Sequence, residues 1–203
     1  MLNLEKNFLK KRILIYGLGK SGLSTYSYLK KNNIISLYDD RIITKKNIKD
    51  THTTYKEIIK KEFDCIIISP GIDINNCKLS RFLKKNHKKI YTDLDIFYSR
   101  YAFNQKITIT GTNGKSTTAK LLYDILKDQK KDVRLVGNIG NPVLLEKKIK
   151  KDTLFVIEAS SYQLEYSKLF KTNISLILNI SPDHLERHKT INKYVSAKFK
   201  LIK

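Results

Sequence analysis

Long apolar runs, cysteines and acidic residues are all scarce in this 203-residue sequence. The longest apolar stretches, such as "CIII" and "SLILNI", are too short to cross a bilayer, so we expect no membrane association. The charged segment "MLNLEKNFLKKR" is followed by "ILIYG", which is too short for a signal-peptide core. The two cysteines, Cys65 and Cys77, have neither the spacing of a metal site nor the number of a disulfide framework. We therefore expect a protein of the reducing cytoplasm.

Acidic residues number 19 against 40 lysines and arginines, which gives a formal net charge of +21. Such an excess suggests a nucleic-acid partner. However, only six of the basic residues are arginine, the lysines are spread along the whole chain, and no stacking motif of aromatic residues with arginine is present. A lysine-rich composition on solvated faces is the simpler explanation, so we expect no nucleic-acid partner.

Short apolar runs alternate with segments of helical periodicity, a pattern that predicts an α/β fold with parallel sheets. We expect a Rossmann-like unit over residues 1–93 and a P-loop-type α/β unit over residues 94–203, because each contains a strand, a glycine loop and a helix in that order. The predicted strands are 12–17, 34–40, 63–69, 106–110, 133–137, 153–158 and 174–181, and the predicted helices include 21–31 and 116–127.

The first glycine loop, "GLGKSG" over residues 17–22, follows a predicted strand and opens a helix. Glycines at such a place allow a tight turn and the close approach of a pyrophosphate to the helix N-terminus. Asp39 and Asp40 end the next strand, about where a ribose-binding carboxylate belongs in a dinucleotide site. The pattern leaves open NAD, another nucleotide or diphosphate ligand, and a plain strand–turn–helix.

The second glycine loop lies in "ITITGTNGKSTTAK". Gly111 and Gly114 leave backbone N–H groups free for phosphate oxygens, Lys115 can reach the outer phosphates, and the Ser116 hydroxyl can bind Mg²⁺. The loop is shorter than the general P-loop pattern, because Ile109 stands where that pattern has its first glycine. A strand followed by this loop and a helix nevertheless predicts a phosphate site rather than a simple turn.

Glu158 ends one predicted strand, and Asp183 and His184 follow another. Ligands of open parallel sheets bind at the carboxyl ends of the strands, so we expect the second glycine loop, Glu158 and His184 to meet at one rim as a Mg-ATP site. Structural roles stay open beside this one. Ser160 and Gln163 can form a capping box, and Asp183 can cap the helix that follows it.

His184 and His188 have the i, i+4 spacing of a zinc pair. The metalloprotease pattern needs a glutamate directly after the first histidine, and Leu185 stands there, so we do not expect zinc.

Lys198 lies on an apolar stripe of the last predicted helix. At about 100° per residue, Ile191, Tyr194, Val195 and Ile202 share its face. The lysine can lie along this face with its amine in water. It can also lose hydration, which lowers the pKa and favours a neutral amine. A neutral amine can add carbon dioxide to form a carbamate, whose oxygens suit Mg²⁺.

Five segments occur in the order found in the Mur ligases of peptidoglycan synthesis: "GTNGKSTTAK", "VGNIGNP", "EASSYQLE", "NISPDHLERH" and "YVSAKFKLI". The chain resembles that family over essentially its whole length. The segments "GLGKSGLS", "ISPGI" and "SSYQLE" are most similar to the member that adds D-glutamate to UDP-N-acetylmuramoyl-L-alanine.

The resemblance implies a ligase that uses ATP to convert the L-alanyl carboxylate of its substrate to an acyl phosphate, from which the D-glutamate amine displaces phosphate. It implies ATP and two Mg²⁺ ions as cofactors, UDP-N-acetylmuramoyl-L-alanine and D-glutamate as substrates, and a monomer. The first glycine loop would then bind the UDP part of the substrate and not NAD. The implied catalytic residues are Lys115, His184 and Lys198, the last as a carbamate.

The resemblance also assigns the remaining site residues by their places in the motifs. The implied ATP-binding residues are Gly111, Thr112, Asn113, Gly114, Lys115, Ser116 and Thr117. The implied substrate-binding residues are Gly17, Gly19, Ser21, Asp39, Asp40, Arg41, Ser69, Gly71, Asn138 and Ser160. The implied metal ligands are Ser116, Glu158, His184 and Lys198.

Mur ligases have three domains, and this sequence resembles only the first and part of the second. We therefore expect a substrate-binding domain over residues 1–93, an incomplete ATP-binding domain over residues 94–203, and no amino-acid-binding domain. The chain alone is expected to lack ligase activity. Two alternatives stay open: a sister ligase that adds another amino acid, and a non-catalytic nucleotide-binding module.

Overall fold

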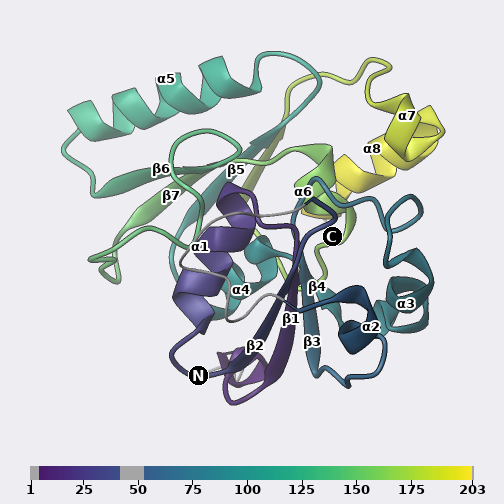
Figure 1. Cartoon of the computed structure of the whole chain (residues 1–203). Coiled ribbons are helices and arrows are strands. Elements are labelled where there is room, and N and C mark those ends of the chain that lie inside the picture. The colour runs from purple at the N-terminus through teal and green to yellow at the C-terminus, as the bar shows by residue number, and fades with distance from the viewer. Residues whose placement is uncertain (1–4, 42–52, 203) are drawn as a thin grey trace. The chain divides into compact units, whose positions relative to one another are not determined.

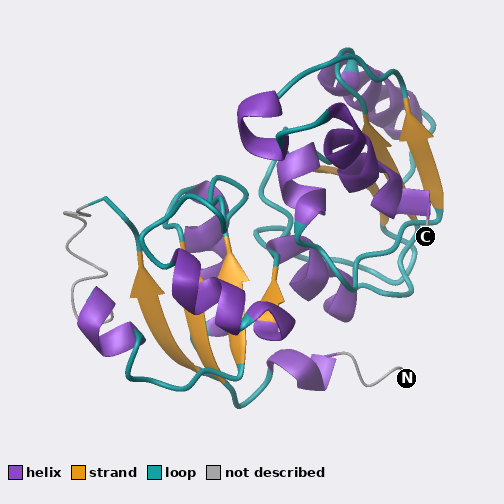
Figure 2. Cartoon of the chain, turned by 90° about the vertical axis from the view of Figure 1, so that its right-hand side faces the viewer, coloured by secondary structure: helices purple, strands orange, loops and turns teal. Residues whose placement is uncertain are grey.

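The computed structural model describes residues 5–41 and 53–202, so the first four residues of the N-terminal segment considered above lie outside the described part. The chain divides into two compact units, Met1–Ile96 and Phe97–Lys203. Each unit contains a four-stranded sheet, and all the strand pairs in both sheets are parallel within the described residues (Figures 1 and 2). The predicted α/β fold with parallel sheets is confirmed. No helix in the described ranges is long and apolar enough to span a membrane.

The first unit has the strand order β2-β1-β3-β4. Every buried residue of its two central strands is apolar, as expected of parallel strands that are covered on both faces. The strands are β1 (Arg12–Tyr16), β2 (Ile34–Tyr38), β3 (Cys65–Ile68) and β4 (Ile90–Tyr91). The helices are η1 (Glu5–Phe8), α1 (Lys20–Leu29), α2 (Tyr55–Ile58), α3 (Ser80–Lys85) and η3 (His87–Lys89), while α4 (Asp93–Arg100) spans the boundary between the units.

The second unit has the strand order β6-β7-β5-β8, and its long helix α5 packs across β5, β6 and β7 (Figure 1). Ile109, Ala119, Val133 and Val156 form the core of this contact. The strands are β5 (Lys106–Thr110), β6 (Val133–Gly137), β7 (Leu154–Glu158) and β8 (Ile174–Ile177). The helices are α5 (Lys115–Asp128), α6 (Ser161–Glu165), α7 (Leu185–His188), α8 (Ile191–Phe199) and η4 (Lys200–Ile202).

The register of the second sheet places its strand ends together. Glu158 at the end of β7 is paired with Ile109 on one side and with Gly137 on the other. The loop after β5, the residue after β6 and the last side chain of β7 therefore meet at one edge. This is the edge at which parallel sheets bind ligands.

Two sequence predictions in this unit need correction. The strand predicted over residues 174–181 ends at Ile177, and beyond it Asn179 bonds to the loop after β5, where its carbonyl accepts from Thr112 N at 3.0 Å. The apolar stripe of the last helix is also narrower than predicted. Ile191 and Ile202 are 37% and 62% exposed, and Tyr194 is the apolar member of that stripe that is almost completely buried.

The first glycine loop is packed tightly at one glycine and loosely at another. A Cβ added to Gly22 would lie 1.8 Å from the carbonyl oxygen of Gly17, which no side chain can occupy without moving the backbone. A Cβ added to Gly19 would meet no atom within 4 Å. Gly22 therefore permits the close contact between the loop and helix α1.

We expect Gly22→Ala to lower the free energy of unfolding by about 1–3 kcal/mol or more, because overpacking forces backbone shifts. Gly19→Ala is the matched control in the same loop and should cost about 1 kcal/mol or less. Urea unfolding of the two variants measures the difference. Equal losses would contradict the tight contact.

Candidate functional site

The second glycine loop connects β5 to α5 with two residues in backbone conformations that favour glycine. Gly111 has φ 152° and Gly114 has φ 80°, and Gly114 is the N-cap of α5. Side chains beyond glycine are strained at such φ values, so the two glycines set the shape of the loop. The loop brings backbone N–H groups to the N-terminus of a 14-residue helix, an arrangement that suits an anion.

Asn179, which follows β8, holds this loop from the neighbouring chain segment. Its carbonyl accepts from Thr112 N at 3.0 Å, its side-chain oxygen accepts from Asn113 N at 2.9 Å, and its amide donates to the Asn113 carbonyl at 3.1 Å. No motif had predicted a role for Asn179. Its place inside the "NISPDHLERH" segment was the only signal for it.

Glu158 is the buried centre of the site. Its side chain has no exposed surface, one oxygen accepts from the Ser116 hydroxyl at 2.8 Å, and the other accepts from the Asn138 amide at 2.7 Å. Gly137, beside it, could not carry a side chain, since a Cβ would lie 2.2 Å from the Glu158 carbonyl. The structure thus brings together Ser116, Asn138 and Glu158, three residues predicted separately.

The oxygen atoms of Ser116 and Glu158 are of the type that Mg²⁺ prefers. Within residues 5–41 and 53–202, no group of three or more His, Cys, Asp or Glu side chains is arranged to hold a metal ion. The protein therefore offers a partial set of ligands. This fits Mg²⁺, which commonly binds through one or two carboxylates together with substrate phosphates and water.

Two lysine amines are bonded to carbonyls of the second glycine loop. Lys115 donates to the Thr112 carbonyl at 2.7 Å, and Lys198 donates to the Gly111 carbonyl at 2.7 Å. Lys198 also lies 3.5 Å from the Thr110 hydroxyl oxygen. Both cations are thus held at the loop by the protein's own backbone.

Lys198 is only 1% exposed, so the interpretation that its amine reaches water along the helix face is wrong. Its amine lies 4.5 Å from the centre of the Tyr194 ring. Burial and the nearby Lys115 charge lower the pKa of Lys198 to about 8, while Asp183 acts in the opposite direction. A larger neutral fraction of the amine follows from this shift.

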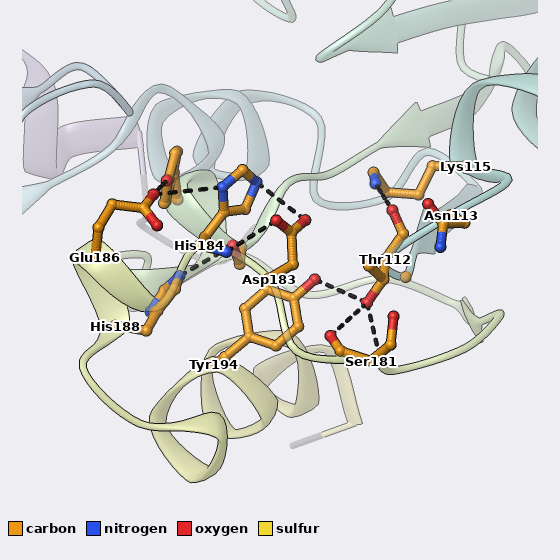
Figure 3. A network of polar contacts seen from close by, with 12 residues as sticks. Thr112, Asn113, Lys115, Ser181, Asp183, His184, Glu186, His188 and Tyr194 are labelled. Carbon is orange, nitrogen blue, oxygen red and sulfur yellow. Dashed lines mark hydrogen bonds and ion pairs between the residues drawn. The ribbon is translucent and has the colours of Figure 1, made fainter.

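His184 lies between two carboxylates (Figure 3). Its Nε2 is 3.4 Å from Asp183 Oδ2, and its Nδ1 is 3.7 Å from Glu186 Oε1. The Tyr162 ring lies 4.7 Å from the imidazole, centre to centre, and its hydroxyl donates to Glu186 at 3.1 Å. His184 itself has φ 54°, an uncommon value for a residue other than glycine.

His188 has the contacts of a buried structural residue and not those of a zinc ligand. It is 2% exposed, its Nε2 lies 3.0 Å from the Ser161 hydroxyl oxygen, and burial lowers its pKa. The helix cap predicted for Asp183 is wrong, because His184 is the N-cap of α7 and Asp183 instead accepts from the His184 backbone N–H at 2.9 Å.

The capping box predicted for Ser160 and Gln163 is confirmed at the start of α6. The Ser160 hydroxyl accepts from Gln163 N at 3.3 Å, and Ser160 N donates to the Gln163 side chain at 3.0 Å. Thr117 is exposed on the first turn of α5. A substrate contact of Ser160 and a nucleotide contact of Thr117 stay predictions.

In the first unit, the acidic residues after β2 are bonded to the glycine loop. Asp39 accepts from Leu18 N at 2.7 Å and from Arg41 N at 3.0 Å. Ser69 donates to the Gly17 carbonyl at 2.6 Å. These contacts gather the ends of β1, β2 and β3 around the loop.

Other residues of this unit that were predicted to bind substrate also form hydrogen bonds within the protein. Asp40 accepts from the Tyr16 hydroxyl at 2.7 Å, and Ser21 donates to the buried carboxylate of Asp93, whose pKa is raised by burial. Gly71 has open space where a side chain would be. The binding roles of all these residues stay predictions.

Comparisons with known proteins find a matching domain for each of the two units. Residues 11–90 match the Mur ligase MurD-like N-terminal domain, and residues 109–203 match the Mur ligase middle domain. Among curated proteins, the UDP-N-acetylmuramoylalanine–D-glutamate ligase of Rickettsia bellii is 36% identical over 197 residues, which is 95% of this chain and 43% of that protein. The enzyme of the same name from Wolbachia pipientis is 37% identical over 209 residues, covering 99% of this chain and 40% of the relative.

The chain thus spans less than half the length of these relatives. Among solved structures, the UDP-N-acetylmuramate:L-alanyl-γ-D-glutamyl-meso-diaminopimelate ligase from Neisseria meningitides matches 95% of this chain and 68% of its own, with a TM-score of 0.59 and 14% identity. UDP-N-acetylmuramate–alanine ligase from Thermotoga maritima matches 92% of this chain and 46% of its own, with a TM-score of 0.52 and 19% identity. These two likenesses concern the fold.

The two domain matches cover most of the sequence in the expected order, and the curated relatives align with nearly all of it. The chain belongs to the Mur ligase family.

Proposed function

We propose that this chain supplies the nucleotide-sugar-binding and ATP-binding parts of a cytoplasmic ligase that joins D-glutamate to UDP-N-acetylmuramoyl-L-alanine. The observation that carries the proposal is the Glu158 carboxylate, which is buried and bonded to Ser116 beside the second glycine loop. The names of the curated relatives support the choice of substrates. We further propose that the chain is a monomer.

The chemistry needs an activated carboxylate, because a carboxylate anion resists attack by an amine. Phosphoryl transfer from ATP to the L-alanyl carboxylate would give an acyl phosphate, and the D-glutamate amine would then displace phosphate. Proteins accelerate phosphoryl transfer mainly by positioning groups and stabilising charge. Lys115, released from the Thr112 carbonyl, is the cation at the loop that can do this.

Ser116 and Glu158 would hold one Mg²⁺, and His184 with a carbamylated Lys198 would support a second. Bound Mg²⁺ would supply positive charge that neutralises the phosphate oxygens. The donors to Glu158, Ser116 and Asn138, are both neutral. Within the described residues no lysine or arginine forms an ion pair with this carboxylate, so its negative charge fits a role in holding Mg²⁺.

In the first unit, the glycine loop and the ends of β2 and β3 would bind the UDP part of the substrate. The Asp39 carboxylate already accepts from two backbone N–H groups, so it shapes the loop. This use of Asp39 favours a diphosphate over the ribose contact expected in an NAD site. Asn138 and Ser160 of the second unit are proposed as further substrate-binding residues.

Amide formation measured for each candidate amino acid would distinguish D-glutamate from the amino acid of a sister ligase. It requires the chain joined to the part of a curated relative that the chain does not cover. Nucleotide binding without amide formation for any amino acid would favour the non-catalytic module.

We expect calorimetry to detect saturable binding of UDP to the chain and no binding of NAD. Arg41→Ala should weaken UDP binding roughly tenfold, since a cation that contacts phosphate contributes about 1.5–3 kcal/mol. Arg81→Ala, which removes an exposed arginine of α3, is the matched control for net charge. Binding of NAD without a response to UDP would contradict the assignment of this unit.

Lys115→Ala should weaken ATP binding by a factor of about 10 to 100, because the amine acts on phosphate charge and not on packing. The control is Lys120→Ala on the same helix, where an exposed lysine pairs with Asp124. Calorimetry with Mg-ATP gives the affinities, and urea unfolding should show the same stability for both variants. Equal ATP affinities would remove Lys115 from the site.

A carbamate on Lys198 should appear as a ¹³C NMR signal when the chain is kept in ¹³C-bicarbonate. Carbon dioxide adds to the neutral amine, so the signal should strengthen as the pH rises toward and past the pKa of about 8. Lys106 is the matched control, because it is equally buried and burial also lowers its pKa to about 8.

The signal should therefore vanish in Lys198→Arg and persist in Lys106→Met. A signal that survives in Lys198→Arg, or that disappears in Lys106→Met, would rule out Lys198 as the modified residue.

A further inference from the structure

Tyr194 of helix α8 contacts both the second glycine loop and Lys198. It is 1% exposed, and its hydroxyl oxygen lies 3.0 Å from Thr112 Oγ1 (Figure 3). Its ring centre lies 4.5 Å from the Lys198 amine. These contacts lie at opposite parts of one side chain, the hydroxyl and the ring. Tyr194 opens the segment "YVSAKFKLI", but the sequence patterns gave it no role.

The hydrogen bonds of Thr112 determine which way the Tyr194 hydroxyl points. The Thr112 hydroxyl donates its one proton to the Ser181 carbonyl at 3.1 Å and accepts from Ser181 N at 3.0 Å. Its remaining lone pair can only accept, so the Tyr194 hydroxyl is the donor. The Thr112 hydroxyl is then saturated, with one bond donated and two accepted, and has no capacity left for a nucleotide.

The ring of Tyr194 is held in place by its neighbours. Its centre lies 5.4 Å from that of His188 in an edge-to-face arrangement, and 6.4 Å from that of His184. His188 in turn contacts the Ser161 hydroxyl of α6. A ring fixed in this way presents its face to Lys198 and its hydroxyl to the loop at the same time.

We propose that Tyr194 is a positioning residue that ties the phosphate-binding loop to Lys198, so that the loop and the lysine keep one relative placement. The proposal rests on the proposed ATP site. Tyr194 does not contact the nucleotide. It acts through Thr112 on the loop and through its ring on the lysine.

This link between the loop and Lys198, called the tether below, has a consequence for the site. Lys198 donates to the Gly111 carbonyl and Tyr194 donates to Thr112, so helix α8 contacts two successive residues of the loop. A nucleotide that orders the loop would also order Lys198. Loss of the tyrosine hydroxyl should release the loop, whereas loss of the ring should release the lysine too.

The first experiment needs no nucleotide. In Tyr194→Phe, the amide protons of Thr112 and Asn113 should exchange with solvent roughly fivefold faster, the effect of losing one hydrogen bond. Amides of β7 report global opening and serve as the internal reference. Tyr101→Phe, a half-buried tyrosine of the same unit, is the matched control and should leave the loop unchanged. Unchanged loop exchange in Tyr194→Phe would overturn the proposal.

The second experiment observes Lys198 directly. The aromatic ring should shift the Lys198 side-chain NMR signals to high field, and this shift should remain in Tyr194→Phe and disappear in Tyr194→Leu. A general loss of structure would not separate the two variants in this way. A shift that persists in a folded Tyr194→Leu variant would contradict the ring contact.

The third experiment is a double-mutant cycle on Mg-ATP affinity. Tyr194→Phe should weaken binding roughly fivefold, and adding it to Thr112→Val should cause little further loss, because both remove the same bond. Additive losses would overturn the proposal. Failure of the wild-type chain to bind ATP would count against the proposed function instead, and the first two experiments would still decide the tether.

Discussion

The buried carboxylate of Glu158 is the constraint on which the site depends. A carboxylate without exposed surface is costly unless its oxygens are bonded, and here the donors are the Ser116 hydroxyl and the Asn138 amide. Each donor follows a different strand, and the parallel register brings the three strand ends to one edge. The fold of the second unit therefore places a buried carboxylate beside the second glycine loop.

The two lysines of the site are held by backbone carbonyls. Lys115 and Lys198 both donate to carbonyls of the loop that they would serve. Backbone carbonyls offer partial negative charge, so each amine keeps a partner without an ion pair. Mg-ATP would have to compete with these internal bonds. Burial, and after it the Lys115 charge, lowers the pKa of Lys198 to about 8.

Local patterns predicted the parallel α/β fold, the glycine loop between β5 and α5, and the meeting of that loop with Glu158, because strand ends and glycine positions follow from short-range chemistry. They failed where a distant segment decides the outcome. Asn179, just beyond the end of β8, bonds to a loop some 66 residues away, which no local pattern could show. The periodicity around Lys198 could not show that its amine bonds Gly111, nor that Ile202 is exposed. Both facts belong to tertiary packing.

The most direct test of the account is a crystal structure of the chain with Mg²⁺ and a non-hydrolysable ATP analogue. The account expects the phosphates on the N–H groups of residues 111–116, with Mg²⁺ between the Ser116 hydroxyl and the Glu158 carboxylate. It also expects Lys115 to have left the Thr112 carbonyl for the phosphates. A nucleotide bound elsewhere, with Ser116 still donating to Glu158 and Lys115 still on the loop, would contradict it.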